Sequence, residues 1–167
     1  SDEFRNKGYD YYFFPEFKHF YENHYFDSWY KKREEFYNSD DSFGEKRKAG
    51  ENDCYICQLI RNDSVEEFIT YVNKNNITLS NQIESSVYET NSFLLDRQPT
   101  IIEYATFYGS IQIFRYLMMN QVRLTPELRK YAIHGKNPLL IHLLEENDIK
   151  FTSNDCYIES VKCHHNE

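Results

Sequence analysis

The feature that most constrains the fold is a pair of short helical patterns with a single tight break between them. Residues 100–117 read TIIEYATFYGSIQIFRYL, and apolar side chains recur at helical spacing on both sides of Tyr108-Gly109-Ser110. An enzyme site, a hairpin of a helical bundle and a unit of a stacking repeat can each contain two such helices. The rest of the chain must therefore decide between these three interpretations.

The same pattern recurs in register along the C-terminal two thirds of the chain. Small or apolar anchor residues are spaced by 46, 27 and 28 residues, and they are Leu59, Ala105, Ala132 and Ser160. Five residues after each anchor stand Ser64, Ser110, Asn137 and His165, of which the first three are good helix caps. Apolar or aromatic positions follow at nine residues (Phe68, Phe114, Ile141) and at twelve residues (Tyr71, Leu117, Leu144). So small a unit buries its apolar face only against its neighbours, and we therefore predict a stack of helix pairs rather than an ordinary closed bundle.

The spacing of apolar residues predicts seven short helices, near 53–61, 65–75, 100–107, 111–120, 126–134, 138–147 and 154–165. Ser64 to Glu67 has the form of a capping box. Thr125-Pro126 and Asn137-Pro138 each place a capping residue before a proline, which fits the first position of a helix. The connection 76–98 is long, and we expect a further short helix inside it.

The first 50 residues differ in composition, so we predict two regions: an aromatic-rich N-terminal segment with a linker (1–50) and a helical repeat domain (51–167). The segment 1–50 holds more than half of the aromatic residues of the chain. They spread around a predicted helix near 15–37 without forming a clean face. Residues 38–52 are polar and contain glycine, which predicts a linker, and its basic cluster Lys46-Arg47-Lys48 is interpreted as solvated.

The overall charge and the lack of long apolar runs exclude several classes of partner. The formal net charge of -8 argues against nucleic acid, because binding to phosphates needs clustered Lys and Arg. No apolar run approaches the roughly 18 residues of a membrane helix, so we expect no membrane partner. Four cysteines and an acidic N-terminus without an apolar segment predict a reducing, cytoplasmic setting.

Residues 100–117 resemble the ankyrin-repeat pattern T-P-L-H-x-A-A-x-x-G-H-x-x-I-V-x-x-L-L. The matching residues are Thr100, Ile102, Ala105, Gly109, Ile113 and Leu117, and the departures are Ile101, Glu103 and Thr106. The next unit, TPELRKYAIHGKNPLLIHLLEEN, keeps Ala132 and its apolar core positions, but it has Lys136 where the pattern has glycine. The resemblance implies an all-α, ankyrin-like solenoid of stacked antiparallel helix pairs.

More closely, residues 53–167 resemble the divergent ankyrin-type proteins that are expanded in certain parasitic protists and carry a domain of unknown function. Units of 27–28 residues are shorter than the 33 residues of an ordinary ankyrin repeat, which implies that the β-hairpins are degenerate or missing. The resemblance also implies that further repeats follow residue 167, so that the domain is truncated at its C-terminus.

Cysteine and histidine residues near the two ends of the repeat region offer the strongest candidate for chemistry. Cys54, Cys57, Cys163, His164 and His165 supply enough thiol and imidazole ligands for a tetrahedral zinc ion. In a linear stack, however, the two clusters lie at opposite ends. We therefore expect no metal, no cofactor and no enzymatic activity. A metal- or redox-responsive module stays an alternative, as does a repeat domain that positions an activity in residues 1–50.

In the ankyrin pattern, the two residues before the turn glycine face the concave groove. These positions are Phe107 and Tyr108, and by register Arg61, Asn62, His134 and Gly135. Aromatic and arginine side chains are enriched among the residues that dominate binding energy at protein interfaces. We therefore expect a non-catalytic scaffold that binds another protein through its concave face. The acidic charge favours a partner with a basic or mixed surface, whereas the oligomeric state stays open.

Overall fold

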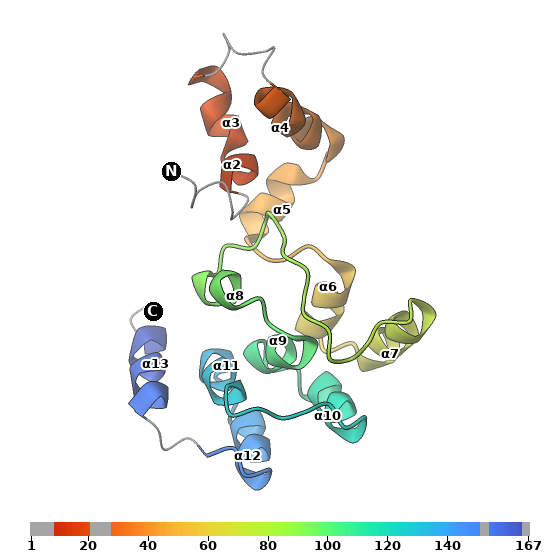
Figure 1. Ribbon diagram of the computed structural model, residues 1–167, viewed down its shortest axis with the longest axis vertical. Helices are drawn as coiled ribbons and strands as arrows, with labels where there is room; N and C mark the ends of the chain where they lie inside the picture. Colours follow the sequence, from red (N-terminus) through yellow and green to blue (C-terminus); the bar gives the residue numbers. More distant parts are fainter. Residues whose placement is uncertain (1–8, 21–27, 151–153, 165–167) are drawn as a thin grey trace. The chain divides into compact units, whose positions relative to one another are not determined.

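A computed structural model of the chain describes residues 9–20, 28–150 and 154–164 (Figure 1). The regular structure of these residues is helical, apart from one isolated antiparallel bridge between Gln82 and Thr100. The predicted all-α class is therefore confirmed. The chain divides into two compact units, which are described separately below. The first contains the described residues up to Cys54 together with Glu84–Arg97, and the second contains Tyr55–Ile83 and the described residues from Gln98 onward.

The first unit is built from short helices around an aromatic core. The helices are α2 (Tyr9–Tyr12), α3 (Phe14–Phe17), α4 (Ser28–Ser39), α5 (Phe43–Ala49) and α8 (Ser92–Arg97). Both α2 and α3 pack against α4, and the buried rings of Phe14 and Tyr30 meet edge to face at 5.2 Å. The prediction of one helix over 15–37 is therefore wrong, because α3 ends at Phe17 and α4 packs beside it. Residues 21–27 of that prediction lie outside the described residues.

A buried arginine shows how the first unit uses its many aromatic residues. The guanidinium of Arg33 stacks between the rings of Tyr11 and Trp29, at 4.5 and 4.3 Å from their centres. Its Nε donates a hydrogen bond to the Asp10 carboxylate at 2.9 Å. The aromatic faces and the carboxylate together compensate for removing the charge from water. One aromatic residue of α4, Trp29, thus packs against a cation.

Residues 38–52 form part of the folded first unit, so the prediction of a polar linker is wrong. Within this range lies α5, whose first residue, Phe43, is buried and touches the rings of Phe36, Tyr37 and Tyr88. Lys46, which we interpreted as solvated, pairs with the carboxylates of Asp40 and Asp53 at 2.8 and 3.2 Å. One apolar side chain and a set of ion pairs therefore order a segment whose composition is typical of a linker.

The second unit contains the seven helices that the sequence predicts. They are α6 (Tyr55–Arg61), α7 (Val65–Lys74), α9 (Ile101–Phe107), α10 (Ile111–Met119), α11 (Leu128–Gly135), α12 (Pro138–Glu146) and α13 (Asn154–His164). Their bounds agree with the predicted ranges to within two residues. The short helix expected inside 76–98 is also confirmed, and it is α8 of the first unit.

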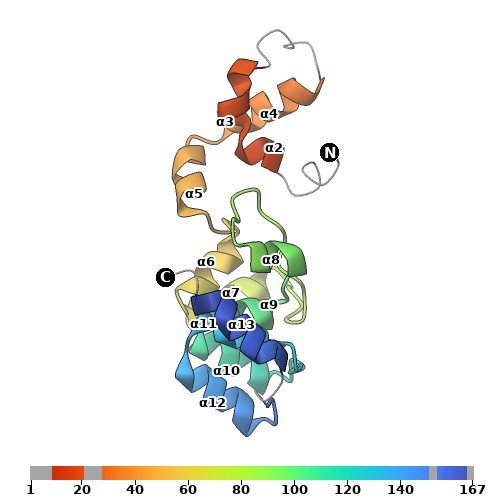
Figure 2. The ribbon, with the colours of Figure 1, turned by 90° about the vertical axis from the view of Figure 1, so that its left-hand side faces the viewer.

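These helices pack as consecutive pairs, in which α6 lies on α7, α9 on α10 and α11 on α12. The first helices of the pairs also pack on one another in chain order, because α6 contacts α9, α9 contacts α11 and α11 contacts α13 (Figure 1). Among the second helices, α7 packs against α10. In the view turned by 90°, α13 crosses in front of α11, and α10 and α12 lie below them (Figure 2).

Each helix pair turns through a residue in the left-handed conformation. Asp63, Gly109 and Lys136 stand four residues after the anchors Leu59, Ala105 and Ala132, with φ angles of 51°, 68° and 48°. In the first two turns the following amide donates back to the anchor carbonyl, from Ser64 at 3.0 Å and from Ser110 at 2.9 Å. These bonds satisfy carbonyls that the end of a helix leaves without a partner. The predicted register therefore corresponds to a recurring backbone turn.

Helix capping follows the sequence predictions only in part. The Asn137 side chain accepts a hydrogen bond from the amide of Leu139 at 3.1 Å, as predicted. Ser64 makes no side-chain cap bond, so the predicted capping box is wrong there. A complete capping box instead joins Thr100 and Glu103 at the start of α9. The cap predicted at Thr125-Pro126 is wrong, because α11 begins at Leu128 and its N-cap residue is Glu127, which makes no side-chain cap bond.

The buried positions of the second helices follow the predicted register, with two shifts. Phe68, Phe114, Leu117 and Leu144 are buried as predicted. In the last pair Leu140 is buried and Ile141 is half-buried, and in α7 the buried residue is Val72 rather than Tyr71.

Candidate partner-binding surface

The six residues predicted to bind a partner stand at the C-terminal ends of three neighbouring helices. They are Arg61 and Asn62 at the end of α6, Phe107 and Tyr108 at the end of α9, and His134 and Gly135 at the end of α11. Because α6, α9 and α11 pack in that order, we call these residues the first-helix row. Asn62 is exposed and the other five are half-buried.

A hydrogen bond and a ring contact join α6 to α9 within the row. Nη1 of Arg61 donates to the hydroxyl oxygen of Tyr104 at 2.8 Å, and the guanidinium lies 5.8 Å from the centre of the Tyr108 ring. Tyr104 itself is buried, and its burial raises the pKa of its hydroxyl far above the ordinary range. The Tyr104 hydroxyl therefore stays neutral and accepts the hydrogen bond from Arg61 without neutralising the charge of the guanidinium.

Aromatic contacts continue the row from α9 to α11. The rings of Phe107 and Tyr108 meet edge to face at 5.0 Å, and the Phe107 ring stacks on the imidazole of His134 at 5.4 Å. Each of these side chains is half-buried, so one side packs on the protein while another part contacts solvent. The row is therefore an ordered surface rather than a set of loose side chains.

Gly135 brings α11 unusually close to α9. A Cβ atom at this position would stand 2.6 Å from the carbonyl oxygen of Thr106 and 2.8 Å from that of Phe107. Both atoms belong to the backbone of α9 or its last turn, which cannot move aside easily. The residue at this position therefore sets the distance between two neighbouring helices of the row.

Two further residues extend the row onto α13, and our sequence interpretation did not include them. Nε2 of His134 lies 2.9 Å from Oε1 of the buried Glu159, and Nζ of Lys162 lies 3.4 Å from the other carboxylate oxygen. Burial acts to raise the pKa of Glu159, but the bond from His134 and the nearby Lys162 outweigh it and hold the pKa below its ordinary value. Glu159 follows Tyr131 by 28 residues, so the repeat register could have identified it.

Polar contacts between successive pairs fix the spacing of the row. The hydroxyl of the buried Ser110 donates to the carbonyl of Ile60 at 2.5 Å, and the Asn137 amide donates to the carbonyl of Gly109 at 3.1 Å. Ser110 and Asn137 occupy the same register position, five residues after their anchors. The same position therefore bonds to the preceding pair at both junctions.

The cysteines form no metal cluster within the part of the chain that the structure describes. None of the four is in a disulfide; Cys57, Cys156 and Cys163 are buried and Cys54 is half-buried. Burial raises the pKa of Cys54 and of Cys163, which keeps these thiols protonated and weakly nucleophilic. The side chain of His164, and His165 as a whole, lie outside the described residues, so the ligand set considered from the sequence is described only in part.

None of the described helices combines the length and the apolar character needed to cross a bilayer. We compared the chain with family models, with curated proteins and with solved structures, and none of them matches it.

Proposed function

We propose that this chain is a non-catalytic, cytoplasmic scaffold that binds another protein through the first-helix row. In this proposal the helix pairs form an ankyrin-like solenoid, and the row lines its concave face. The observation that carries the proposal is the convergence of register-equivalent residues from three successive pairs into one connected set of contacts. Arg61, Tyr108, Phe107 and His134 touch one another in sequence across α6, α9 and α11.

The mechanism of binding is preorganisation. Association loses affinity when it must order flexible side chains, at a cost of about 0.5–1.5 kcal/mol for each one that becomes immobilised. In the row, Arg61 is held by Tyr104, and Phe107 is held by Tyr108 and His134. A partner therefore meets aromatic and cationic groups that are already ordered.

The connections between pairs support the assignment of short, ankyrin-like repeats. Eight residues separate α10 from α11, and they contain no strand. Between α7 and α9, the only β contact of the described residues is the bridge of Gln82 with Thr100. These connections support the degenerate or missing hairpins that the resemblance to short repeats implies.

The net charge of -8 points to a partner with a basic or mixed surface, because an acidic molecule steers such partners toward encounter. The row itself carries cationic groups, including Arg61 and Lys162. A partner of mixed charge satisfies both observations, with acidic groups toward the row and basic groups toward the rest of the scaffold.

Affinity purification with matched variants tests the proposal. The row variant is Tyr108→Ala combined with Arg61→Ala, and the control is Met119→Ala, which alters a residue of α10 that is 84% exposed. We expect a protein recovered by the wild type and by the Met119 variant to be lost, at least about tenfold, from the row variant, since hot-spot truncations cost 2 kcal/mol or more. Equal recovery of every bound protein by a row variant with a native circular dichroism spectrum contradicts the proposal.

A further inference from the structure

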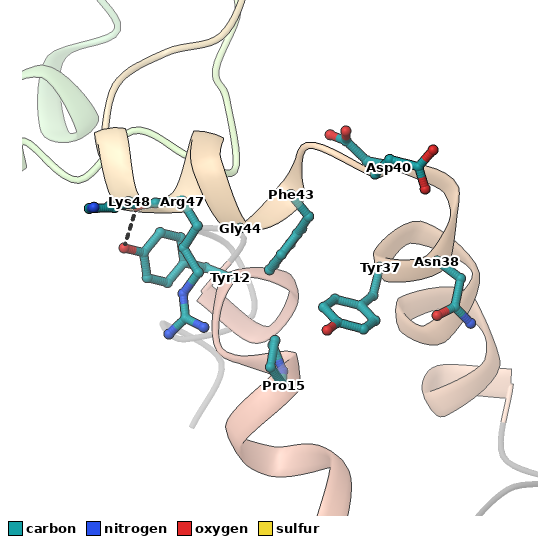
Figure 3. A pocket seen from close by; sticks show the side chains of 10 residues that line it. Tyr12, Pro15, Tyr37, Asn38, Asp40, Phe43, Gly44, Arg47 and Lys48 are labelled. Atoms are coloured by element: carbon teal, nitrogen blue, oxygen red, sulfur yellow. Dashed lines mark hydrogen bonds between the residues drawn. The ribbon is translucent and has the colours of Figure 1, made fainter.

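The first unit contains an open pocket of about 710 Å³ that plays no part in the proposed scaffold surface. Its walls come from α2, α3, α4 and α5 and include Pro15, the half-buried rings of Tyr12 and Tyr37, and Phe43, which is only 4% exposed (Figure 3). Tyr12 lies on one side, Tyr37 on the other, and Phe43 between them, while Pro15 stands opposite α5. We propose that this pocket binds a proline-rich peptide segment that carries a basic residue beside its prolines.

The aromatic walls suit an extended proline-rich chain. Such segments form a left-handed helix with three residues per turn and are recognised in shallow grooves lined by aromatic rings. The rings are already fixed: Tyr37 and Phe43 meet edge to face at 5.1 Å, and the Tyr12 hydroxyl donates to the carbonyl of Arg47 at 3.3 Å. The guanidinium of Arg47 also lies 4.8 Å from the centre of the Tyr12 ring. A ligand that is itself stiff then loses little freedom on binding.

The rim of the pocket offers hydrogen-bonding groups for the peptide backbone. Carbonyls of a proline-rich helix have no partner within their own chain and need external donors. Among the described residues, no hydrogen bond engages the Tyr37 hydroxyl or the side-chain amide of Asn38, and both residues line the pocket. These two groups can therefore donate to peptide carbonyls without breaking an existing contact.

The charges around the pocket specify the position of the basic residue. Asp40 and Asp41 stand at the junction of α4 and α5, whereas Arg47 and Lys48 lie near the end of α5. The pKa of Asp40 is held well below its ordinary range, chiefly by the hydrogen bond from Lys46. The Asp40 carboxylate is therefore ionised, but it already pairs with Lys46. Asp41 is exposed, and no ion pair within the described residues engages it. The basic residue of the peptide is therefore expected at Asp41.

Substitution of one helical glycine can add a side chain that fills part of the pocket. Gly44 lines the pocket, and a Cβ atom at this position would meet no heavy atom within 4 Å. The variant Gly44→Ala adds one methyl group, whereas Gly44→Trp and Gly44→Leu place bulk in the open space. These variants change the same residue of α5, so they separate loss of volume from loss of glycine.

Fluorescence anisotropy of the full chain with labelled synthetic peptides tests the proposal. The probes contain Pro-Pro-Leu-Pro-Pro-Leu-Pro with arginine before it, after it or absent, and one peptide has alanine in place of every proline. We expect saturable, weak binding of an arginine-bearing peptide, with a Kd of about 10–500 µM, as is usual for small interfaces. Gly44→Ala should stay within about twofold of the wild type. Gly44→Trp and Gly44→Leu should weaken binding at least about tenfold, and Asp41→Lys should abolish the preference for arginine.

Nuclear magnetic resonance locates the peptide-binding site independently of the variants. The Gly44 amide of the wild-type chain should shift on addition of the peptide, so the site is located even if the tryptophan variant does not fold. Absence of saturable binding by every proline-containing peptide at about 1 mM, with a native spectrum, overturns the proposal. So does equal binding of the alanine peptide, or full binding by a folded Gly44→Leu variant. None of these results bears on the first-helix row, which belongs to the second unit.

Discussion

At the scale of single residues, two helical glycines differ in what surrounds them. Gly135 of α11 faces two backbone carbonyl oxygens of the α9 region, at 2.6 and 2.8 Å from a Cβ atom built on it. Gly44 of α5 faces open space. Packing therefore requires glycine at the first position, whereas at the second position no packing contact requires it.

Replacement of these glycines by alanine should have opposite effects on stability. We expect Gly135→Ala to lower the free energy of unfolding by about 1–3 kcal/mol, because overpacking against backbone forces α9 and α11 apart. Gly44→Ala should leave it unchanged or raise it by up to about 1 kcal/mol, as alanine is the better helix former. Urea titrations followed by circular dichroism measure both values. A neutral effect of Gly135→Ala would show that the helices are not so close.

The hydrogen-bonded pair of His134 and Glu159 predicts a specific response to acid. The folded state holds the pKa of Glu159 below its ordinary value, so the pair contributes stability that is present above the unfolded pKa and is lost as pH falls through the folded one. The wild type should therefore lose stability between about pH 5 and pH 3 more steeply than Glu159→Gln, which does not titrate at this position. Urea midpoints across this range provide the test, and identical pH profiles for the two proteins would rule out the pair.

The repeat register predicted part of the candidate site at this scale. Arg61, Phe107 and His134 occupy one register position, and the structure brings them into one row. Glu159 shares its register position with Tyr104 and Tyr131, so the spacing relates the three residues, but it does not specify that the Tyr104 hydroxyl and the Glu159 carboxylate are buried. Buried polar groups need partners, and those partners come from neighbouring pairs rather than from nearby sequence.

At the scale of elements, each pair of helices turns at the same register position, although the residue differs. Gly109 takes a φ of 68° without steric cost, whereas Lys136 takes a φ of 48° with a side chain that disfavours it. The resemblance to the ankyrin pattern identified Lys136 as a departure at this position. Its left-handed backbone shows that the turn persists without the glycine.

Exchanging these turn residues should change stability in opposite directions. We expect Lys136→Gly to stabilise the protein by about 0.5–1 kcal/mol, because glycine relieves the strain at the end of α11. Gly109→Ala should destabilise it by about 1–2 kcal/mol, since alanine would adopt a left-handed conformation and would also approach the Asn137 side chain at 3.2 Å. Thermal unfolding of the two variants measures the changes. A stabilising Gly109→Ala would exclude the turn.

The sequence predicted helix bounds well where each helix buries one periodic face, and poorly where it does not. In the second unit every helix packs one face against a neighbouring helix, so the spacing of apolar residues predicted the bounds of α7 and α10 closely. In the first unit the core joins α3, α4 and α5 with the segment that holds Tyr88. Aromatic residues on several sides of α4 leave no periodic face, and the supposed linker is ordered by the buried Phe43 together with the ion pairs of Lys46.

At the scale of the second unit as a whole, successive pairs are joined by polar contacts as well as by apolar packing. The carboxylate of Asp63, in the turn between α6 and α7, accepts hydrogen bonds from the amides of Gln112 and Ile113, each at 3.0 Å. It thereby satisfies two amides at the start of α10 in the next pair. A residue of one pair thus acts as the cap of the following pair.

Removal of this cap should weaken the coupling between the pairs. We expect Asp63→Ala to cost about 1–2 kcal/mol, the range of a lost helix cap, and Asp63→Asn to recover part of it because an amide oxygen still accepts a bond. Hydrogen exchange should show faster exchange of the Gln112 and Ile113 amides in the alanine variant. Unchanged exchange at both amides would mean that Asp63 does not cap α10.

The order in which the first helices lie side by side is the central claim of this account, and nuclear Overhauser effects between side chains measure it most directly. The account predicts cross-peaks between the Phe107 ring and the His134 ring, which join α9 to α11, and between the Arg61 and Tyr104 side chains, which join α6 to α9. Contacts of α6 with α11 or α13 in place of these, or the absence of both cross-peaks in a folded chain, would contradict it.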